Sequence, residues 1–207
     1  MATRLSTGVD VLDRELGGGI PSGSVVAFCA PPASQSELFL YELTTARRTL
    51  YLTADRTENA VQEALTRTAA PTGDPTVRYV AGDAPLENAR RLFRNAGEGA
   101  GLVIDPVDPL ERADQARYQN FLNDLTNHMQ NTQGVAVLHC LTGREAEART
   151  LTEHMADVVL RLYVERDGTD IETQLGVLKF RGGQAPEDTI KLQLAERVQI
   201  DTSRDIA

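Results

Sequence analysis

Residues 25–39 have the layout of a phosphate-binding loop but lack most of the residue types that phosphate chemistry needs. The run VVAFCAPPASQSELF predicts a buried strand, a turn and the start of a helix. At such a turn the pattern G-x-x-x-x-G-K-S/T binds a nucleotide. Its glycines let backbone N–H groups face the phosphates, its lysine supplies positive charge and its hydroxyl holds Mg²⁺. These four positions are occupied here by Ala30, Gln35, Ser36 and Glu37, so the architecture of a nucleotide site is present without its chemistry.

The rest of the turn also opposes a bound triphosphate. Pro31 and Pro32 have no backbone N–H to donate, and the carboxylate of Glu37 would repel phosphate oxygens. Ser34 and Glu37 instead fit the capping-box pattern S-x-x-E, in which the two side chains satisfy backbone N–H groups at the start of a helix. We therefore expect a helix that carries its own anion where a nucleotide-binding protein holds a phosphate. The altered loop comprises Ala30, Pro31, Pro32, Ala33, Ser34, Gln35, Ser36 and Glu37.

Strands that alternate with helices must position this turn. Apolar runs predict five strands, at residues 25–29, 49–53, 77–80, 102–105 and 134–139. Helical patterns separate these strands; the first covers residues 36–46 and the longest covers residues 113–130. Such alternation predicts an α/β fold with a mostly parallel central sheet flanked by helices. Further along the chain the pattern changes to that of antiparallel strands, at residues 158–164, 171–180 and 189–200.

The run STGVDVLDRELGGGIPSGSVVAF, residues 6–28, resembles the N-terminal signature of RecA-superfamily ATPases of the KaiC/RadA type. In that group a short helix and a glycine-rich turn lead into the strand before the phosphate loop. The resemblance implies a RecA-like P-loop NTPase fold over nearly the whole chain. We expect a single domain at 1–207, with a lead-in at 1–24, a parallel core at 25–140 and a C-terminal β extension at 158–200.

The resemblance also gives roles to three polar residues near predicted strand ends. Asp105 takes the place of the Walker B acid that organises Mg²⁺, and His139 takes that of the polar γ-phosphate sensor. Asp55 takes the first place of an acidic pair that activates the attacking water. Arg56 occupies the second place, so no general base is expected. For Asp105 a residual carboxylate, and for His139 a hydrogen-bonded histidine at a strand end, stay open as alternatives.

The segment KFRGG, residues 179–183, resembles the K-x-R-G segment of the KaiC group. In that group the two cations reach across a subunit interface to the nucleotide of the neighbour. The resemblance implies that Lys179 and Arg181 act in trans on an active KaiC/RadA-like paralogue, or on another copy of this chain. A solvated turn after a strand is the alternative.

Two cysteines cannot form a disulfide framework, so Cys29 and Cys140 are expected to be buried thiols. The resemblance to RecA-like proteins implies that the strand at 25–29 neighbours both the strand that ends at Asp105 and the strand that ends at His139. That arrangement would gather the two thiols, the carboxylate and the imidazole near one sheet edge. Their spacing contains no C-x-x-C or H-x₃-H, so no metal site is expected.

The composition is acidic, with a formal net charge of −9. Of 21 basic residues only Lys179 and Lys191 are lysines, so 19 are arginines. Few lysines, many carboxylates and no Trp indicate a protein of a salt-rich cytoplasm, as in a halophilic archaeon, with a high-GC mesophile as the alternative. An acidic chain argues against DNA as a partner. The regions that correspond to the DNA-binding loops of RadA-type proteins mix acids with Arg112, Arg117, Arg144 and Arg149.

The longest apolar runs fall short of the roughly 18 residues of a membrane span, and the N-terminus lacks the apolar core of a signal peptide. We therefore expect a cytoplasmic protein with no membrane contact.

These features together predict a non-catalytic, pseudo-ATPase module that regulates or signals through protein contacts and needs no cofactor. One alternative is a KaiC-like ATPase that still binds Mg·ATP through an atypical loop. The other is a RadA-like paralogue that binds DNA.

Overall fold

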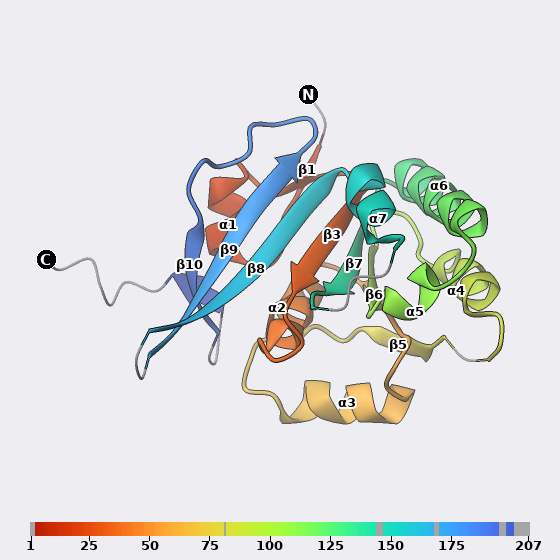
Figure 1. Cartoon of the computed structure of the whole chain (residues 1–207), viewed down its shortest axis with the longest axis horizontal. Helices are drawn as coiled ribbons and strands as arrows, with labels where there is room; N and C mark the ends of the chain where they lie inside the picture. Colours follow the sequence, from red (N-terminus) through yellow and green to blue (C-terminus); the bar gives the residue numbers. More distant parts are fainter. Residues whose placement is uncertain (1–2, 81, 144–146, 168–169, 195–197, 201–207) are drawn as a thin grey trace, which may run out of the picture.

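One nine-stranded sheet with helices on both faces forms the centre of the molecule (Figure 1). The computed structural model describes residues 3–80, 82–143, 147–167, 170–194 and 198–200. Within these residues the strand order is β11-β10-β9-β8-β3-β7-β6-β4-β5. A separate antiparallel pair joins β1 (Arg4–Leu5) to β2 (Ile20–Pro21).

The parallel part of the sheet contains the five strands predicted for the core. They are β3 (Ser24–Ala30), β4 (Thr49–Thr53), β5 (Thr76–Tyr79), β6 (Gly101–Asp105) and β7 (Val135–Leu141). One expected neighbour is wrong, because β3 pairs with β7 and β8 but not with β6. The chain that leaves β6 crosses over through a long helix and inserts β7 between β3 and β6. The strand that ends near His139 therefore separates the altered loop from the strand that ends at Asp105.

The C-terminal part of the sheet is antiparallel. Its first strand, β8 (Val158–Asp167), joins the two parts because it runs parallel to β3 and antiparallel to β9 (Asp170–Phe180). The single strand predicted at 189–200 is two, β10 (Ile190–Leu194) and β11 (Val198–Ile200), which pair with each other. The predicted α/β class is confirmed, with a mostly parallel sheet and an antiparallel C-terminal extension.

Helices cover the sheet in two groups, each with its own apolar core. The first group is α1 (Asp10–Glu15), α2 (Ser36–Leu43) and α3 (Glu58–Arg67). The second is α4 (Pro85–Phe93), α5 (Asp108–Glu111), α6 (Gln115–Thr132) and α7 (Arg149–Met155). Successive residues of β3 point to opposite faces, so Phe28 packs in the core of the first group with Phe39, and Cys29 packs in the core of the second with Phe121. Both cores are therefore anchored on the strand that precedes the altered loop.

Two predicted helices differ from the observed ones at their ends. The helix expected at 36–46 is α2 followed by a 3₁₀ turn, η1 (Thr44–Ala46). The long helix expected at 113–130 begins later, at Gln115, because the side chain of Asp114 accepts hydrogen bonds from the backbone of Ala116 and Arg117.

The glycine triplet after α1 sets the path of the lead-in. Gly17, Gly18 and Gly19 all have positive φ angles, which residues with a Cβ atom rarely adopt. A Cβ atom at Gly19 would lie 2.2 Å from the carbonyl oxygen of Leu5. The close pairing of β1 with β2 therefore depends on this glycine.

A buried charge cluster ties the segment after β6 to the segment after β7. Arg149, at the start of α7, is 2% exposed and donates hydrogen bonds to Glu111, Asp108 and the carbonyl oxygen of Leu141. Glu111 also accepts a hydrogen bond of 2.5 Å from Thr152. These bonds fix α5 and α7 against each other on the second core.

Arg149→Leu should therefore lower the free energy of unfolding by about 3–5 kcal/mol, because it leaves the buried carboxylate of Glu111 without its cation. Urea denaturation of the variant and the wild type measures this loss. Arg112→Leu, which removes the same charge from an exposed side chain, should lose less than about 1 kcal/mol. Equal losses in the two variants would contradict the role given to the cluster.

Candidate functional site

The altered loop links β3 to α2 at the carboxyl ends of the parallel strands, where ligands bind in open α/β sheets. In Figure 1 this turn lies next to the end of β7. The register of the two strands places Phe28 opposite His139 and Cys29 opposite Cys140. The loop and His139 therefore face each other across one pair of strands.

The expected capping box is wrong. The helix begins at Ser36, and its N-cap is Gln35, whose side chain makes no capping hydrogen bond and whose backbone is left-handed at φ 53° and ψ 28°. Ser34 therefore lies one residue outside the cap and donates from its hydroxyl to the carbonyl oxygen of Pro31 at 2.5 Å. Glu37 is the second helical residue and not the third, so the reciprocal pair cannot form. Its carboxylate still lies in the first turn, where negative charge complements the helix dipole.

Ser36 belongs to a buried chain of hydrogen bonds that crosses three elements. Its Oγ lies 3.0 Å from His139 Nε2, and His139 Nδ1 lies 2.6 Å from Asp105 Oδ1. The three residues are only 2%, 4% and 4% exposed, and the imidazole stacks on Phe28 at 5.7 Å between ring centroids. Because an ionised carboxylate can only accept, Nδ1 donates to Asp105, and Nε2 is left to share a hydrogen bond with the Ser36 hydroxyl. We name this set the Ser36–His139–Asp105 chain.

The second oxygen of Asp105 is bound as well. Tyr51, fully buried on β4, donates to Oδ2 at 2.5 Å, and Arg56 Nη2 donates to the same oxygen at 2.7 Å. Arg56 Nη1 also contacts the hydroxyl of Tyr41 on α2 at 3.2 Å. Both carboxylate oxygens are therefore satisfied from within the protein.

These partners decide the ionisation of Asp105. Burial by itself would raise the pKa of its carboxyl. The hydrogen bond and charge of His139, the hydroxyl of Tyr51 and the charge of Arg56 outweigh burial and lower the pKa from 3.8 to about 2. The neighbouring Tyr51 has a pKa well above its usual value, because of burial and then the charge of Asp105. The cluster thus holds a buried carboxylate beside a neutral phenol.

The structure brings together Asp105 and His139 but leaves Asp55 outside. Asp55 is exposed, and within the described residues no hydrogen bond connects it to the Ser36–His139–Asp105 chain. Arg56, its neighbour, turns toward Asp105 instead. The sequence did not reveal Tyr51 and Arg56 as partners, since a tyrosine in a buried strand and an arginine after it are common. The only available signal was the single arginine in the expected acidic pair.

Lys179 and Arg181 both bind the carboxyl end of α7. Lys179 Nζ donates to the carbonyl oxygens of Glu153 at 3.1 Å and His154 at 2.7 Å, and Arg181 Nη2 donates to His154 at 3.0 Å. Cations at a helix C-terminus satisfy unpaired carbonyls and complement the dipole. Partial burial, followed by the charge of Arg181, lowers the pKa of Lys179. Within this chain the two cations therefore cap a helix.

The two thiols are buried, as predicted, and Cys29 Sγ lies 3.3 Å from a carboxylate oxygen of Glu153. In the described part of the chain, no group of three or more His, Cys, Asp or Glu residues could hold a metal ion. Among the same residues, no helix is both long and apolar enough to span a lipid bilayer.

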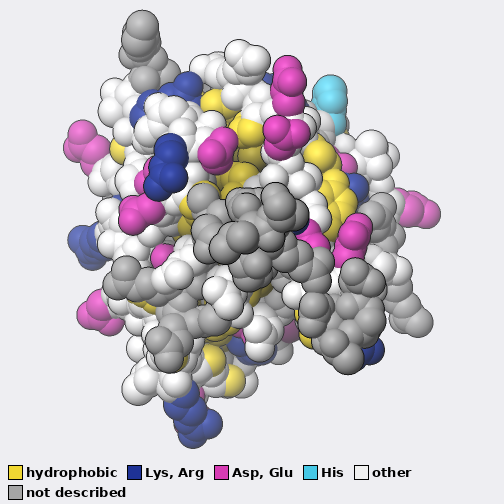
Figure 2. Space-filling model, turned by 90° about the vertical axis from the view of Figure 1, so that its left-hand side faces the viewer, with side chains coloured by type: hydrophobic (Ala, Val, Ile, Leu, Met, Phe, Trp, Pro, Cys, Tyr) yellow, Lys and Arg dark blue, Asp and Glu magenta, His cyan; other side chains and the backbone are white. Residues whose placement is uncertain are grey.

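The arginines of the two loop regions have different surroundings. Arg149 is buried in the cluster with Glu111, Arg117 forms an ion pair with Glu87, and Arg112 is exposed. Arg144 lies outside the described residues. On the face shown in Figure 2, basic side chains stand apart among acidic ones and do not form a continuous path. Neither observation supports a track for a nucleic-acid backbone.

Asp105→Asn tests the electrostatic role of the cluster. A carboxyl whose pKa is lower in the folded than in the unfolded state stabilises the fold above its unfolded pKa of about 3.8, and this contribution disappears as pH falls toward 2. The wild type should lose about 1.5–2 kcal/mol more than the variant between pH 4 and pH 2 in urea denaturation. Asp74→Asn, at an exposed carboxyl, should keep the wild-type pH dependence. An identical pH profile for Asp105→Asn and the wild type would refute this assignment.

Comparisons with known proteins agree with this architecture. A crystal structure of KaiC-like protein PH0186 from the hyperthermophilic archaeon Pyrococcus horikoshii OT3 superposes with a TM-score of 0.77 and 14% sequence identity, covering 96% of this chain and 100% of that one. This similarity shows a KaiC-like RecA fold. No curated protein sequence matches the chain. The model of a family of unknown function, DUF7125, matches residues 4–207, and the chain therefore belongs to the DUF7125 family.

Proposed function

We propose that this protein is a non-catalytic, pseudo-ATPase module with a KaiC-like fold that regulates or signals through protein contacts. The observation that carries the proposal is the Ser36–His139–Asp105 chain, together with Arg56 and Tyr51. In this interpretation residues 30–37 are a degenerate Walker A loop. Positions 36, 105 and 139, which in active relatives contact phosphate or metal, form hydrogen bonds with one another here.

The hydrogen-bond inventory supports this interpretation. Mg²⁺ needs nearly octahedral oxygen ligands and gives up its water reluctantly. A Mg²⁺ ion at Asp105 would first have to displace Tyr51, Arg56 or His139, which satisfy both carboxylate oxygens. At position 36 the hydroxyl of Ser36 replaces the lysine ammonium group that would bind phosphate. This hydroxyl forms a hydrogen bond with His139. No cofactor is therefore assigned to this chain.

The Ser36–His139–Asp105 chain has the same three residue types, in the same order of contact, as the catalytic triad of serine hydrolases. Two features give it a structural role instead. Ser36 is 2% exposed, so a substrate cannot reach its Oγ without opening the loop. Asp105 also bonds Arg56 and Tyr51, which hold the chain within the core. Absence of covalent labelling by a fluorophosphonate probe is expected, and stoichiometric labelling of Ser36 would favour a hydrolase.

The proposed partner is an active KaiC/RadA-like paralogue or a second copy of this chain. The resemblance of residues 179–183 to the K-x-R-G segment of the KaiC group supports such an assembly. In an assembly with an active paralogue, Lys179 and Arg181 would leave the end of α7 and reach the nucleotide of that paralogue. An acidic composition with 19 arginines and two lysines supports a cytoplasmic protein of a halophilic archaeon. In the same proposal residues 1–207 form one domain.

A DNA-binding role is not supported by the face shown in Figure 2, where basic side chains form no continuous surface.

Calorimetry with Mg·ATP in concentrated KCl tests the first part of the proposal. No dissociation constant tighter than about 100 μM is expected, because no lysine, inward glycine turn or free hydroxyl is available to the phosphates. Tighter binding, reduced at least tenfold by Asp105→Asn, would instead establish an ATP-binding protein with an atypical loop. A salt-dependent gel shift with duplex DNA checks the remaining alternative.

A double variant, Lys179→Ala/Arg181→Ala, tests the trans-acting role. It should lower binding to an active KaiC-like paralogue, or self-association, by at least tenfold in light-scattering measurements. Lys191→Ala is the matched control, because it removes the other lysine of the chain, which lies on β10 and forms a surface ion pair with Glu172 on β9. Circular dichroism must show intact helices, since the two cations also cap α7. Unchanged assembly in a folded double variant would exclude the trans role.

A further inference from the structure

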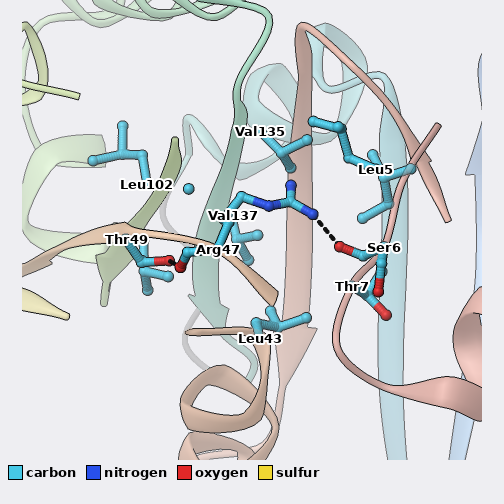
Figure 3. Close-up of a pocket in the computed structure, with 12 residues that line it drawn as sticks. Leu5, Ser6, Thr7, Leu43, Arg47, Thr49, Leu102, Val135 and Val137 are labelled. Atoms are coloured by element: carbon cyan, nitrogen blue, oxygen red, sulfur yellow. Dashed lines mark hydrogen bonds between the residues drawn. The ribbon is translucent and has the colours of Figure 1, made fainter. Parts of the chain in front are cut away.

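Strand β5 lies at one end of the nine-stranded sheet, so one of its two long edges has no neighbouring strand among the described residues. Its inner edge pairs in parallel with β4. The strand β4 is itself enclosed, because β6 runs along its other side, and Figure 3 shows Leu102 of β6 near Thr49 at the start of β4. An open edge such as that of β5 presents backbone N–H and C=O groups to which a strand of another molecule can bind.

The outward-facing backbone groups of this edge belong to Val77 and Tyr79. Backbone groups of successive strand residues point to opposite sides, and the Val80 N–H donates inward to the Thr53 carbonyl oxygen at 2.8 Å. The even-numbered residues of β5 therefore face β4, and the odd-numbered ones face away from it. Tyr79 also has a large hydrophobic side chain that is 40% exposed. An edge with outward backbone groups and an exposed aromatic ring favours pairing with another strand.

Two charged side chains occupy two of the four outward groups. Glu58 Oε1 accepts a hydrogen bond from the Tyr79 backbone N–H at 2.9 Å. Arg78 Nη1 donates to the carbonyl oxygen of Val77 at 2.7 Å. The occupied groups are the inner two of the set, between the Val77 N–H and the Tyr79 carbonyl. A second strand could therefore not form consecutive hydrogen bonds along this edge.

The packing of α3 places Glu58 at this edge. Thr57 is the N-cap of α3, and Glu58 is its first residue. Val61 and Leu65 on the buried side of α3 belong to the same apolar core as Val77 of β5. In Figure 1 α3 lies alongside β5. The contact between the helix and the strand therefore holds the carboxylate beside the backbone of β5.

We propose that Glu58 and Arg78 close the β5 edge, so that a second copy of this chain cannot extend the sheet by pairing with it. Two β5 edges that met antiparallel about a two-fold axis would join two nine-stranded sheets into one. Such pairing needs the Val77 carbonyl and the Tyr79 N–H, and the two side chains bind both groups. Charged side chains protect the open edges of natural sheets in the same way.

Self-association of the double variant Glu58→Ala/Arg78→Ala tests the proposal. Sedimentation equilibrium on the whole chain should give an association constant at least tenfold above that of the wild type, because both edge groups become available. Glu63→Ala/Arg67→Ala is the matched control, since it also removes one acid and one base, from an exposed ion pair on α3, and it should associate like the wild type. No increase in the edge variant, or an equal increase in the control, would overturn the proposal.

A third substitution separates backbone pairing from contact through the Tyr79 ring. Tyr79→Pro, added to Glu58→Ala/Arg78→Ala, removes the outward N–H and should restore the wild-type association constant. Tyr79→Ala in the same background removes the ring but keeps the N–H, so association should stay above the wild-type value. Restoration by both substitutions, or by neither, would contradict pairing through the backbone.

Hydrogen exchange of the Tyr79 amide, followed by NMR in dilute solution, tests the contact with Glu58 without any association. Exchange should be at least tenfold faster in Glu58→Ala than in the wild type. Glu58→Gln should stay close to the wild type, because its amide oxygen can accept the same hydrogen bond. Equal exchange in Glu58→Ala and the wild type would exclude the role given to Glu58. If a multiple variant does not fold, these single substitutions still decide.

The β5 edge is distinct from the surface around Lys179 and Arg181. Five strands, β8, β3, β7, β6 and β4, separate β5 from β9, which carries Lys179. Adding Lys179→Ala/Arg181→Ala to Glu58→Ala/Arg78→Ala should therefore leave the increase in association unchanged. Loss of the increase would assign it to the other surface and overturn the proposal, whereas the trans role of Lys179 and Arg181 is decided by its own test.

Discussion

A buried carboxylate needs its partners, and at this site Asp105 determines where they must lie. His139, Tyr51 and Arg56 come from β7, β4 and the segment after β4, and all three point to the end of β6. An ionised carboxylate without these partners would be costly in a core that excludes water. Position 36 belongs to the same set, since Ser36 satisfies the far nitrogen of the imidazole. The altered loop is therefore connected through buried hydrogen bonds to two strands of the sheet, unlike a turn that lies on the surface without such contacts.

Strand order makes that unit possible. Because β7 lies between β3 and β6, His139 can contact the loop after β3 on one side and the carboxylate of β6 on the other. The expected order, with β3 beside β6, would have placed Asp105 directly under the loop and left His139 no bridging role. One imidazole reaches both neighbours since its two nitrogens point in opposite directions.

Features that depend on a pattern repeated over many residues could be predicted from the sequence. The alternation of apolar strands with helices predicted the α/β class, and the apolar run at 25–29 predicted the buried strand that contains Cys29. The capping box could not be predicted reliably, because one residue of shift decides whether Ser34 or Gln35 is the cap, and the left-handed backbone of Gln35 leaves no signature in the sequence. The partners of Asp105 were equally hidden, since they come from three segments that only the folded sheet brings together. Lys179 and Arg181 were identified as a pair from the sequence, but their contact with α7 could not be predicted because α7 itself was not predicted.

The shared hydrogen bonds of Ser36, His139 and Asp105 also have a consequence for evolution. A lysine at position 36 would remove the hydroxyl that satisfies His139 before any phosphate contact was gained. Freeing Asp105 Oδ2 for a metal would require changes at both Tyr51 and Arg56, because either residue alone still donates to that oxygen. Nucleotide chemistry at this site would therefore need several coordinated changes, because the groups involved are hydrogen-bonded to one another. If the chain descends from an ATPase, the hydrogen bonds among these residues make the loss of that activity hard to reverse by single substitutions.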